Sequence, residues 1–183
     1  MRSIENSKKP DNSIMIKYLL IILITTISPL IIAFIIYSNH PNSNLLKAIF
    51  EATSGFPALL SANNLLLSSV LNAWCKTAPF WGLVLFSLSF KHIQIKGGQS
   101  EGSMIKGLVL FSILYIPIVG MLLLSSAEIT ESGKIYRAMS KNDYLLTGLF
   151  MTIYIVCYTF TAFYLLMLAA VCQTINKKRK FFI

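Results

Sequence analysis

Charged residues are scarce in this chain of 183 residues. Only 13% of the residues are Asp, Glu, Lys or Arg, whereas 55% are hydrophobic. A soluble domain typically has about 25% charged residues, so this chain has roughly half of the usual supply with which to cover a surface that faces water. The shortage excludes an ordinary soluble globular domain and indicates a protein embedded in lipid.

Histidine and cysteine are also rare, with two and three copies. The topology predicted below places His40 and His92 on opposite sides of a membrane, where they cannot share a metal ion or a catalytic triad. The chain has no zinc-protease, nucleophile-elbow or phosphate-loop motif. Its cysteines lack C-x-x-C spacing, and no pair is placed to form a disulfide. The sequence therefore predicts no enzymatic activity, no cofactor and no metal site.

The shortage of charge is concentrated in three long stretches. No charged residue occurs in 18–37, in 107–127 or in 144–176. A helix needs about 20 apolar residues to cross the hydrocarbon core of a bilayer, and each stretch is long enough. The sequence predicts an all-α membrane protein, a bundle of four transmembrane helices in a single domain over 1–183. The predicted spans are at about 18–38, 69–90, 107–127 and 144–172.

Prolines lie within two of the predicted spans. Pro29 is expected to kink the first helix without ending it, because nearby hydroxyl groups such as that of Ser28 can bond to the freed carbonyl groups. Pro117 predicts a second kink in the third span. One turn further on, Gly120 is expected to allow the close approach of another helix.

The second span is the least regular. Residues 77–90 alone would form a helix of about 21 Å, which is too short, so the span is extended back to Ser69. This places Lys76 one to two turns inside the boundary, from where its long stem can carry the ammonium group outward. Trp74 and Trp81 fit the aromatic belt of a membrane interface.

The chain between the first two spans is predicted to lie outside the membrane. A short interfacial helix is expected over 45–50. A further span over 52–75 is rejected, because Pro57 and the adjacent Asn63 and Asn64 favour turns there.

Basic residues determine the predicted orientation. Eleven of the 16 Lys and Arg residues lie in 1–17, 91–106 and 177–183, which the four-span arrangement places on one side. The positive-inside rule assigns this side to the cytoplasm, so both terminal tails are predicted to be cytoplasmic. Orientation signals and contact with the lipid bilayer explain the net charge of +9, and no nucleic-acid partner is predicted.

Hydroxyl groups recur at helical spacing in the fourth span, at Thr147, Tyr154, Tyr158 and Thr161. This face is interpreted as a seam within the bundle, with a partner surface as the alternative. Spans one, three and four have no ionisable group of the kind that transporters and channels place at mid-membrane. A small multi-pass transporter or channel subunit remains an alternative function, motivated by the two kinked spans.

Two motifs carry a family resemblance. Residues 74–80 read Trp-Cys-Lys-Thr-Ala-Pro-Phe, and residues 128–133 read Glu-Ile-Thr-Glu-Ser-Gly. With these motifs the chain resembles the immunity proteins of pore-forming colicins, of the colicin A and B type, over most of 28–143. It departs from the family pattern at Glu131, where a small uncharged residue is expected, and in the loop 96–103.

The resemblance implies a function without catalysis. Proteins of this family sit in the inner membrane of the bacterium that makes the toxin. They bind the toxin's pore-forming domain, in particular its hydrophobic helical hairpin, and prevent the channel from opening. Because the toxin arrives from outside, first discrimination is expected at the outer ends of the spans. The predicted partner-binding residues are Lys76, Thr77, Pro79, Glu128, Thr130, Gly133 and Arg137.

Two of these residues also have predicted backbone roles. Gly133 is expected to form a turn with positive φ. Pro79 is expected in a first helical turn or at a kink.

Overall fold

Most of the backbone is helical in a computed structural model of the chain, which describes residues 13–90 and 101–181. Two very short strands are also present, β1 (Leu59–Leu60) and β2 (Ala127–Glu128). The helices of the described residues are α1 (Ser13–Asn39), α2 (Asn44–Thr53), α3 (Leu65–Cys75), α4 (Ala78–Ser89), α5 (Glu101–Leu124), α6 (Lys134–Ser140) and α7 (Asp143–Phe181).

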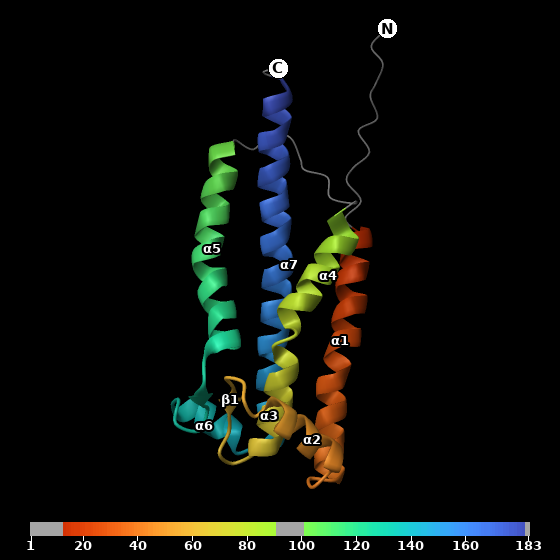
Figure 1. The fold of residues 1–183 in the computed structure, drawn as a ribbon, viewed down its shortest axis with the longest axis vertical. Helices are drawn as coiled ribbons and strands as arrows, with labels where there is room; N and C mark the ends of the chain where they lie inside the picture. The colour runs from red at the N-terminus through yellow and green to blue at the C-terminus, as the bar shows by residue number, and fades with distance from the viewer. Residues whose placement is uncertain (1–12, 91–100, 182–183) are drawn as a thin grey trace.

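The long helix α7 is the centre of the fold. It packs against α1, α3, α4, α5 and α6. Figure 1 shows α5 on one side of α7, with α4 and α1 on the other. The short elements gather at the lower end of the bundle in that view, and we call residues 40–64 and 125–142 the cap. The first and last described residues lie at the opposite end.

Three helices are long and apolar enough to cross a membrane, by length and composition, among the residues that the structure describes. They comprise Met15–Asn39, Gly102–Leu124 and Asp143–Ile175. Large apolar side chains point outward from them, and Ile24 and Leu110 are 70% and 65% exposed. Contiguous apolar surface of this kind is costly in water and is expected against lipid. The chain is a membrane protein.

The segment of the predicted second span, 69–90, is not one continuous helix. The chain forms α3 and α4, of 11 and 12 residues, with a break at Lys76 and Thr77. Each is about 17–18 Å long at 1.5 Å per residue, shorter than a hydrocarbon core of about 30 Å. Figure 1 shows α4 leaning away from the line of α3 toward α1.

Proline chemistry explains the break. Pro79 has no N–H to donate to the carbonyl group of Cys75, and its ring crowds that carbonyl. The backbone turns tightly instead, with the Thr77 N–H bonded to the Trp74 carbonyl at 2.9 Å. Pro79 lies in the first turn of α4, as predicted, because this is where a missing N–H costs least.

Pro29 has a milder effect, and α1 continues through it, as predicted. Its missing N–H would have bonded to the carbonyl group of Thr25. The Ser28 hydroxyl donates to that carbonyl at 2.7 Å, so the freed acceptor is satisfied within the helix.

The predicted seam on α7 is confirmed. Thr147, Tyr154, Tyr158 and Thr161 are all buried. The tight contact with a neighbouring helix occurs at Gly82 of α4, where an added Cβ would lie 2.7 Å from the Thr161 Cβ. At Gly120 an added Cβ would meet nothing within 4 Å, so no helix of the described residues uses the close approach that this glycine permits.

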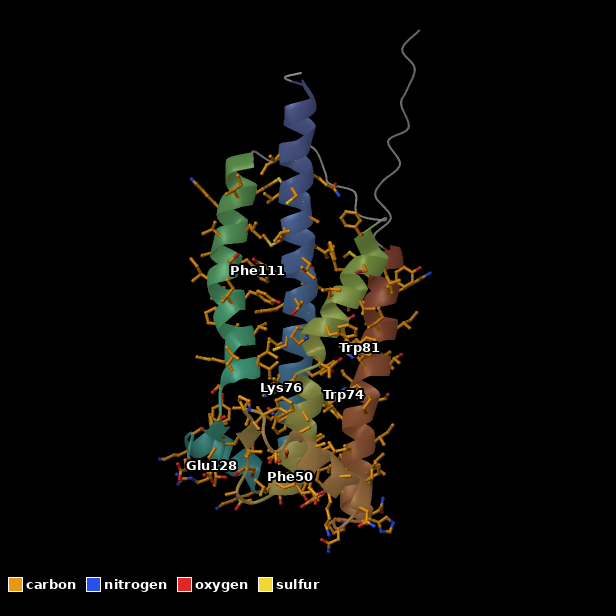
Figure 2. All side chains as sticks on the ribbon, viewed as in Figure 1. Phe50, Trp74, Lys76, Trp81, Phe111 and Glu128 are labelled. Atoms are coloured by element: carbon orange, nitrogen blue, oxygen red, sulfur yellow. The ribbon has the colours of Figure 1, made fainter. Side chains whose placement is uncertain are left out.

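Aromatic side chains join α5 to α7. The rings of Tyr115 and Tyr164 are stacked with centroids 4.4 Å apart, and Phe111 packs beside both. The Tyr115 hydroxyl also donates to the Thr161 hydroxyl at 3.2 Å. This contact holds α5 along the side of the bundle opposite α1 (Figure 2).

Several helix boundaries differ from the predicted ones. The short helix expected over 45–50 is confirmed as α2, which is longer. Helix α5 ends at Leu124, so Ala127 belongs to β2, and α7 continues beyond residue 172. Residues 1–12 of the predicted tail, the loop 91–100 with His92, and residues 182–183 lie outside the described residues.

Candidate functional site

A two-stranded parallel sheet joins the connection between α2 and α3 to the connection between α5 and α6. Leu59 of β1 is opposite Ala127 of β2, and Leu60 is opposite Glu128. The N–H of Ile129 donates to the carbonyl group of Leu60 at 2.8 Å. The all-α prediction missed this sheet, which ties the segment after α2 to the segment after α5.

Side chains of α3 cover the other edge of β1. The backbone N–H of Leu59 donates to Asn72 Oδ1 at 3.3 Å, and that of Ser61 donates to Ser68 Oγ at 3.0 Å. Asn72 and Ser68 are both buried. A strand edge that would otherwise expose unpaired N–H groups is therefore satisfied by a helix.

A second set of bonds joins the loop after β1 to the start of α7. The Asn63 amide donates to Ser140 Oγ at 3.1 Å, and the Asn64 amide donates to the carboxylate of Asp143. The Ser61 hydroxyl donates to the carbonyl group of Ser140 at 3.4 Å. These bonds close the cap over the end of α7.

Asn142 is the N-cap of α7. Its side-chain oxygen accepts from the backbone N–H groups of Tyr144 and Leu145, at 2.9 and 3.3 Å. These are donors that the first turn of a helix leaves without partners. The start of the central helix is thereby fixed within the cap.

Lys76 connects three parts of the molecule. It lies between α3 and α4, and its ammonium group donates to the carbonyl group of Pro57 in the cap and to that of Leu123 at 3.3 Å. Figure 2 shows Lys76 where the bundle meets the cap. Leu123 is in the last turn of α5, where exposed carbonyl groups favour a positive charge. The sequence analysis expected the long stem to carry the ammonium group outward. In the structure, backbone carbonyl groups hold the ammonium group where the bundle meets the cap.

Thr77 and Pro79 shape the joint between α3 and α4. The Thr77 hydroxyl donates to the carbonyl group of Trp74 at 2.8 Å. The Thr77 carbonyl accepts from the N–H of Trp81 at 3.2 Å. Both predicted residues are half-buried, and their observed contacts are within the joint.

The predicted residues of the third connection lie in the cap. The Thr130 hydroxyl accepts from the N–H of Ala62 at 3.2 Å, and the Thr130 carbonyl accepts from Arg137 Nε at 3.2 Å. Gly133 has φ 128°, which confirms the predicted positive φ. Glu128, Gly133 and Arg137 are exposed, and Figure 2 shows Glu128 at the outer side of the cap.

The structure brings most of the predicted site together. Lys76, Glu128, Thr130, Gly133 and Arg137 lie in or against the cap, although the two motifs are about 50 residues apart in the sequence. Thr77 and Pro79 lie just behind it, at the joint. The sequence interpretation missed the polar residues that assemble the cap, although the Asn-Asn and Asn-Asp pairs give a signal for them. These residues are Asn63, Asn64, Asn72, Ser140 and Asp143.

The cap offers no arrangement for metal chemistry in the part of the chain that the structure describes. No group of three His, Cys, Asp or Glu side chains is placed to hold an ion there. Cys75, Cys157 and Cys172 are free thiols. The site is a polar surface at one end of an apolar bundle, and it exposes both positively and negatively charged side chains.

Fold and site together define a small helical membrane protein whose polar groups are organised into a cap at one end. The chain belongs to the colicin immunity protein family, whose model matches residues 42–180.

Named relatives cover nearly the whole chain. It is 28% identical to the colicin-A immunity protein of Citrobacter freundii, over 96% of this chain and 98% of that protein. It is 24% identical to the colicin-B immunity protein of Escherichia coli, over 91% and 93% of the two chains. It is 32% identical to the colicin-N immunity protein of Escherichia coli, over 62% of this chain and 86% of that protein. No solved structure matches.

Proposed function

We propose that this chain protects the bacterium that makes it from a pore-forming colicin. It does so by binding the toxin's pore-forming domain within the inner membrane and keeping the channel closed. The observation that carries this proposal is the family membership, with similarity to the colicin-A immunity protein along nearly the full length of both chains. The proposed role is binding, and no residue is assigned to catalysis.

In the proposed arrangement the chain crosses the membrane four times. Helices α1, α5 and α7 each cross alone, and α3 and α4 cross in series beside α7. An even number of crossings is supported by the position of both described ends opposite the cap (Figure 1). Eleven of the 16 Lys and Arg residues lie in the sequence segments 1–17, 91–106 and 177–183, which adjoin the helix ends opposite the cap. This supports an outward-facing cap and two cytoplasmic tails.

The seven predicted partner-binding residues divide into two groups under this proposal. Glu128, Gly133 and Arg137 are exposed on the cap and are placed to meet the toxin first. The side chains of Lys76 and Thr77 form hydrogen bonds within the chain. Pro79 shapes the joint between α3 and α4, and Thr130 forms hydrogen bonds within the cap. This second group holds the shape of the recognition surface, and the Lys76 ammonium keeps a third donor beyond its two internal bonds.

The toxin's hydrophobic helical hairpin is proposed to lie along α5. This helix packs mainly against α7 and leaves large apolar residues such as Ile113 and Met121 exposed. Space is open at Gly120 on the same helix. Helices associate in lipid where small residues let their backbones approach, which supports an incoming helix at this position.

A protection assay tests the proposal. Expression of this chain alone in a sensitive bacterium should prevent killing by a colicin A- or B-type pore former and leave sensitivity to nuclease colicins unchanged. Unchanged killing by every pore former of this type, with the protein verified in the inner membrane, would refute it.

A reporter fusion tests the orientation. An enzyme that is active only in the cytoplasm should be active when fused after Lys180, and one that requires export should be active when inserted at Gly55 of the cap. Activity of the exported reporter at the C-terminal fusion would reverse the map.

The alternative function, a small transporter or channel subunit, makes a different prediction. The purified chain in liposomes would then conduct solute or ions with no toxin present. A bilayer that stays tight at high protein content would remove this alternative.

A further inference from the structure

A small pocket lies behind Lys76, between α3 and the end of α2. Its volume is about 250 Å³. Its polar lining residues are Ser69, Asn72, Lys76 and Thr53, and the Thr53 hydroxyl is bonded to the carbonyl group of Ile49 at 2.7 Å. Phe56 and Pro57 belong to its apolar wall. The pocket is at the level where the bundle meets the cap, near the Lys76 label in Figure 2.

The amide of Asn72 has a fixed orientation. Asn72 is 2% exposed, and its Oδ1 accepts from the backbone N–H of Leu59 at 3.3 Å. A backbone N–H can only donate, so the oxygen must face β1 and the NH₂ group must face away from it. Among residues 13–90 and 101–181, no acceptor is bonded to this NH₂ group.

Ser69 and Lys76 add further donors. Ser69 is 5% exposed, and within the described parts of the chain its hydroxyl has no hydrogen-bond partner. The Lys76 ammonium has three donors, of which two are used by the carbonyl groups of Pro57 and Leu123. No described Asp or Glu forms an ion pair with it.

The three groups together form a site for an anion. An amide NH₂, a hydroxyl and an ammonium line one pocket, with a single positive charge among them. Donors that line a pocket and are not used within the chain can bind a ligand, and charged acceptors form the strongest bonds with such groups. A carboxylate has the matching single negative charge and about four acceptor positions.

We propose that this pocket binds the carboxylate of an Asp or Glu side chain from the toxin's pore-forming domain. The apolar wall at Phe56 and Pro57 fits the methylene groups of such a side chain. The pocket would then be a specificity determinant beneath the exposed charges of the cap. This inference rests on the proposed function.

The substitution Asn72→Asp tests the proposal with little change of shape. It keeps the oxygen that accepts from Leu59, removes the NH₂ donors and places a carboxylate beside Lys76, so that the pocket supplies its own anion. The toxin concentration at which half of the cells survive should fall at least about thirtyfold, as expected for the loss of a buried charge contact. Membrane level and unfolding temperature should be retained.

A matched control and a second variant separate recognition from folding. Asn42→Asp makes the same chemical change at an exposed position of the cap and should leave protection unchanged. Ser69→Ala removes a hydroxyl that has no internal partner and should reduce protection about two- to tenfold. Wild-type protection by Asn72→Asp would overturn the proposal.

The partner carboxylate can be identified by a double-mutant cycle. Each Asp and Glu of the pore-forming domain is changed to Asn or Gln and tested against the wild type and Asn72→Asp. One toxin variant should escape the wild-type protein and show little further loss against Asn72→Asp, because the two changes remove one contact. Additive losses for every toxin variant would overturn the assignment.

A measurement without toxin tests the anion site separately from the proposed function. In detergent micelles, sodium acetate should shift the NMR signals of the Asn72 side-chain NH₂ group, whereas sodium chloride at equal ionic strength should not. If the chain responds to acetate but protects against no pore former, the proposed function is refuted and the anion site is still supported. No acetate response, or a response to short-chain phosphatidylglycerol alone, would overturn the carboxylate assignment.

Discussion

The indole nitrogen of Trp74 donates a hydrogen bond to the main-chain oxygen of Thr26, 2.8 Å away. Thr26 lies in α1, three residues before Pro29, and Trp74 is near the end of α3. The bond therefore joins the proline-perturbed turn of α1 to the last turn of the helix before the break. Two irregular backbone sites stabilise each other through one side chain.

Replacement of Trp74 by Phe keeps most of the apolar contact and removes this bond. The free energy of unfolding should fall by about 1 kcal/mol, and α1 should lose protection from hydrogen exchange near Thr26. Denaturation in mixed micelles measures the first effect. Trp81→Phe is the matched control, because no hydrogen bond of that indole is observed among the described residues. Equal losses in both variants would mean that ring size alone matters.

Replacement of Gly82 by Ala should separate α4 from α7. The new Cβ would lie 2.7 Å from the Thr161 Cβ and 2.8 Å from the carbonyl oxygen of Tyr158, distances that require the helices to move. A cost of about 1–3 kcal/mol is expected from such overpacking. Gly120→Ala is the control, since a Cβ there meets nothing within 4 Å and alanine favours a helix. A neutral Gly82→Ala variant would contradict the observed packing.

Gly133 supports the turn before α6. Its φ of 128° belongs to a region that is essentially restricted to glycine, with a cost of about 1–3 kcal/mol for other residues. Gly133→Ala should therefore lower stability by that amount and reduce protection, because Arg137 would no longer be held against the Thr130 carbonyl. Gly55→Ala, also in the cap and without positive φ, should be nearly neutral. Loss of protection in both variants would point to a general sensitivity of the cap.

Charge reversal on α6 tests whether the cap surface determines toxin choice. Lys134 and Arg137 are exposed there, and replacing both by Glu should change which pore former is resisted while the membrane level stays constant. Each exposed charge is worth about 1 kcal/mol at most, or about fivefold in protective dose. Lys47→Glu on α2 is the control for net charge. Equal protection before and after reversal would place recognition in the helices within the membrane.

The long helices could be predicted because their signal is local. An uncharged stretch of about 20 apolar residues has few alternatives to a membrane helix, and the effect of Pro29 was predicted correctly because Ser28 is adjacent to it. The break between α3 and α4 was predicted only in part, as a first helical turn or kink at Pro79. Hydropathy is nearly continuous through 69–90, and only the details of hydrogen bonding show that the helix restarts after Thr77.

The cap could not be predicted in detail. Two-residue strands such as β1 and β2 have no periodicity that a sequence reveals, and their pairing joins segments almost 70 residues apart. The motifs around Lys76 and Thr130 indicated where recognition residues would lie, but their internal bonds depend on the fold. The neighbour of Gly120 could not be predicted for the same reason, because a small residue permits a close approach without specifying whether the neighbour belongs to the same chain.

The bonds from Ser61, Asn63 and Asn64 to Ser140 and Asp143 have a consequence for biosynthesis. Because their partners are separated by 76 to 79 residues, the loop after β1 cannot form these bonds until translation has passed the start of α7. By then α1, α3 and α4 have already been synthesised. The cap is thus among the last parts of the fold to be completed, and a nascent chain halted before residue 140 cannot form these bonds.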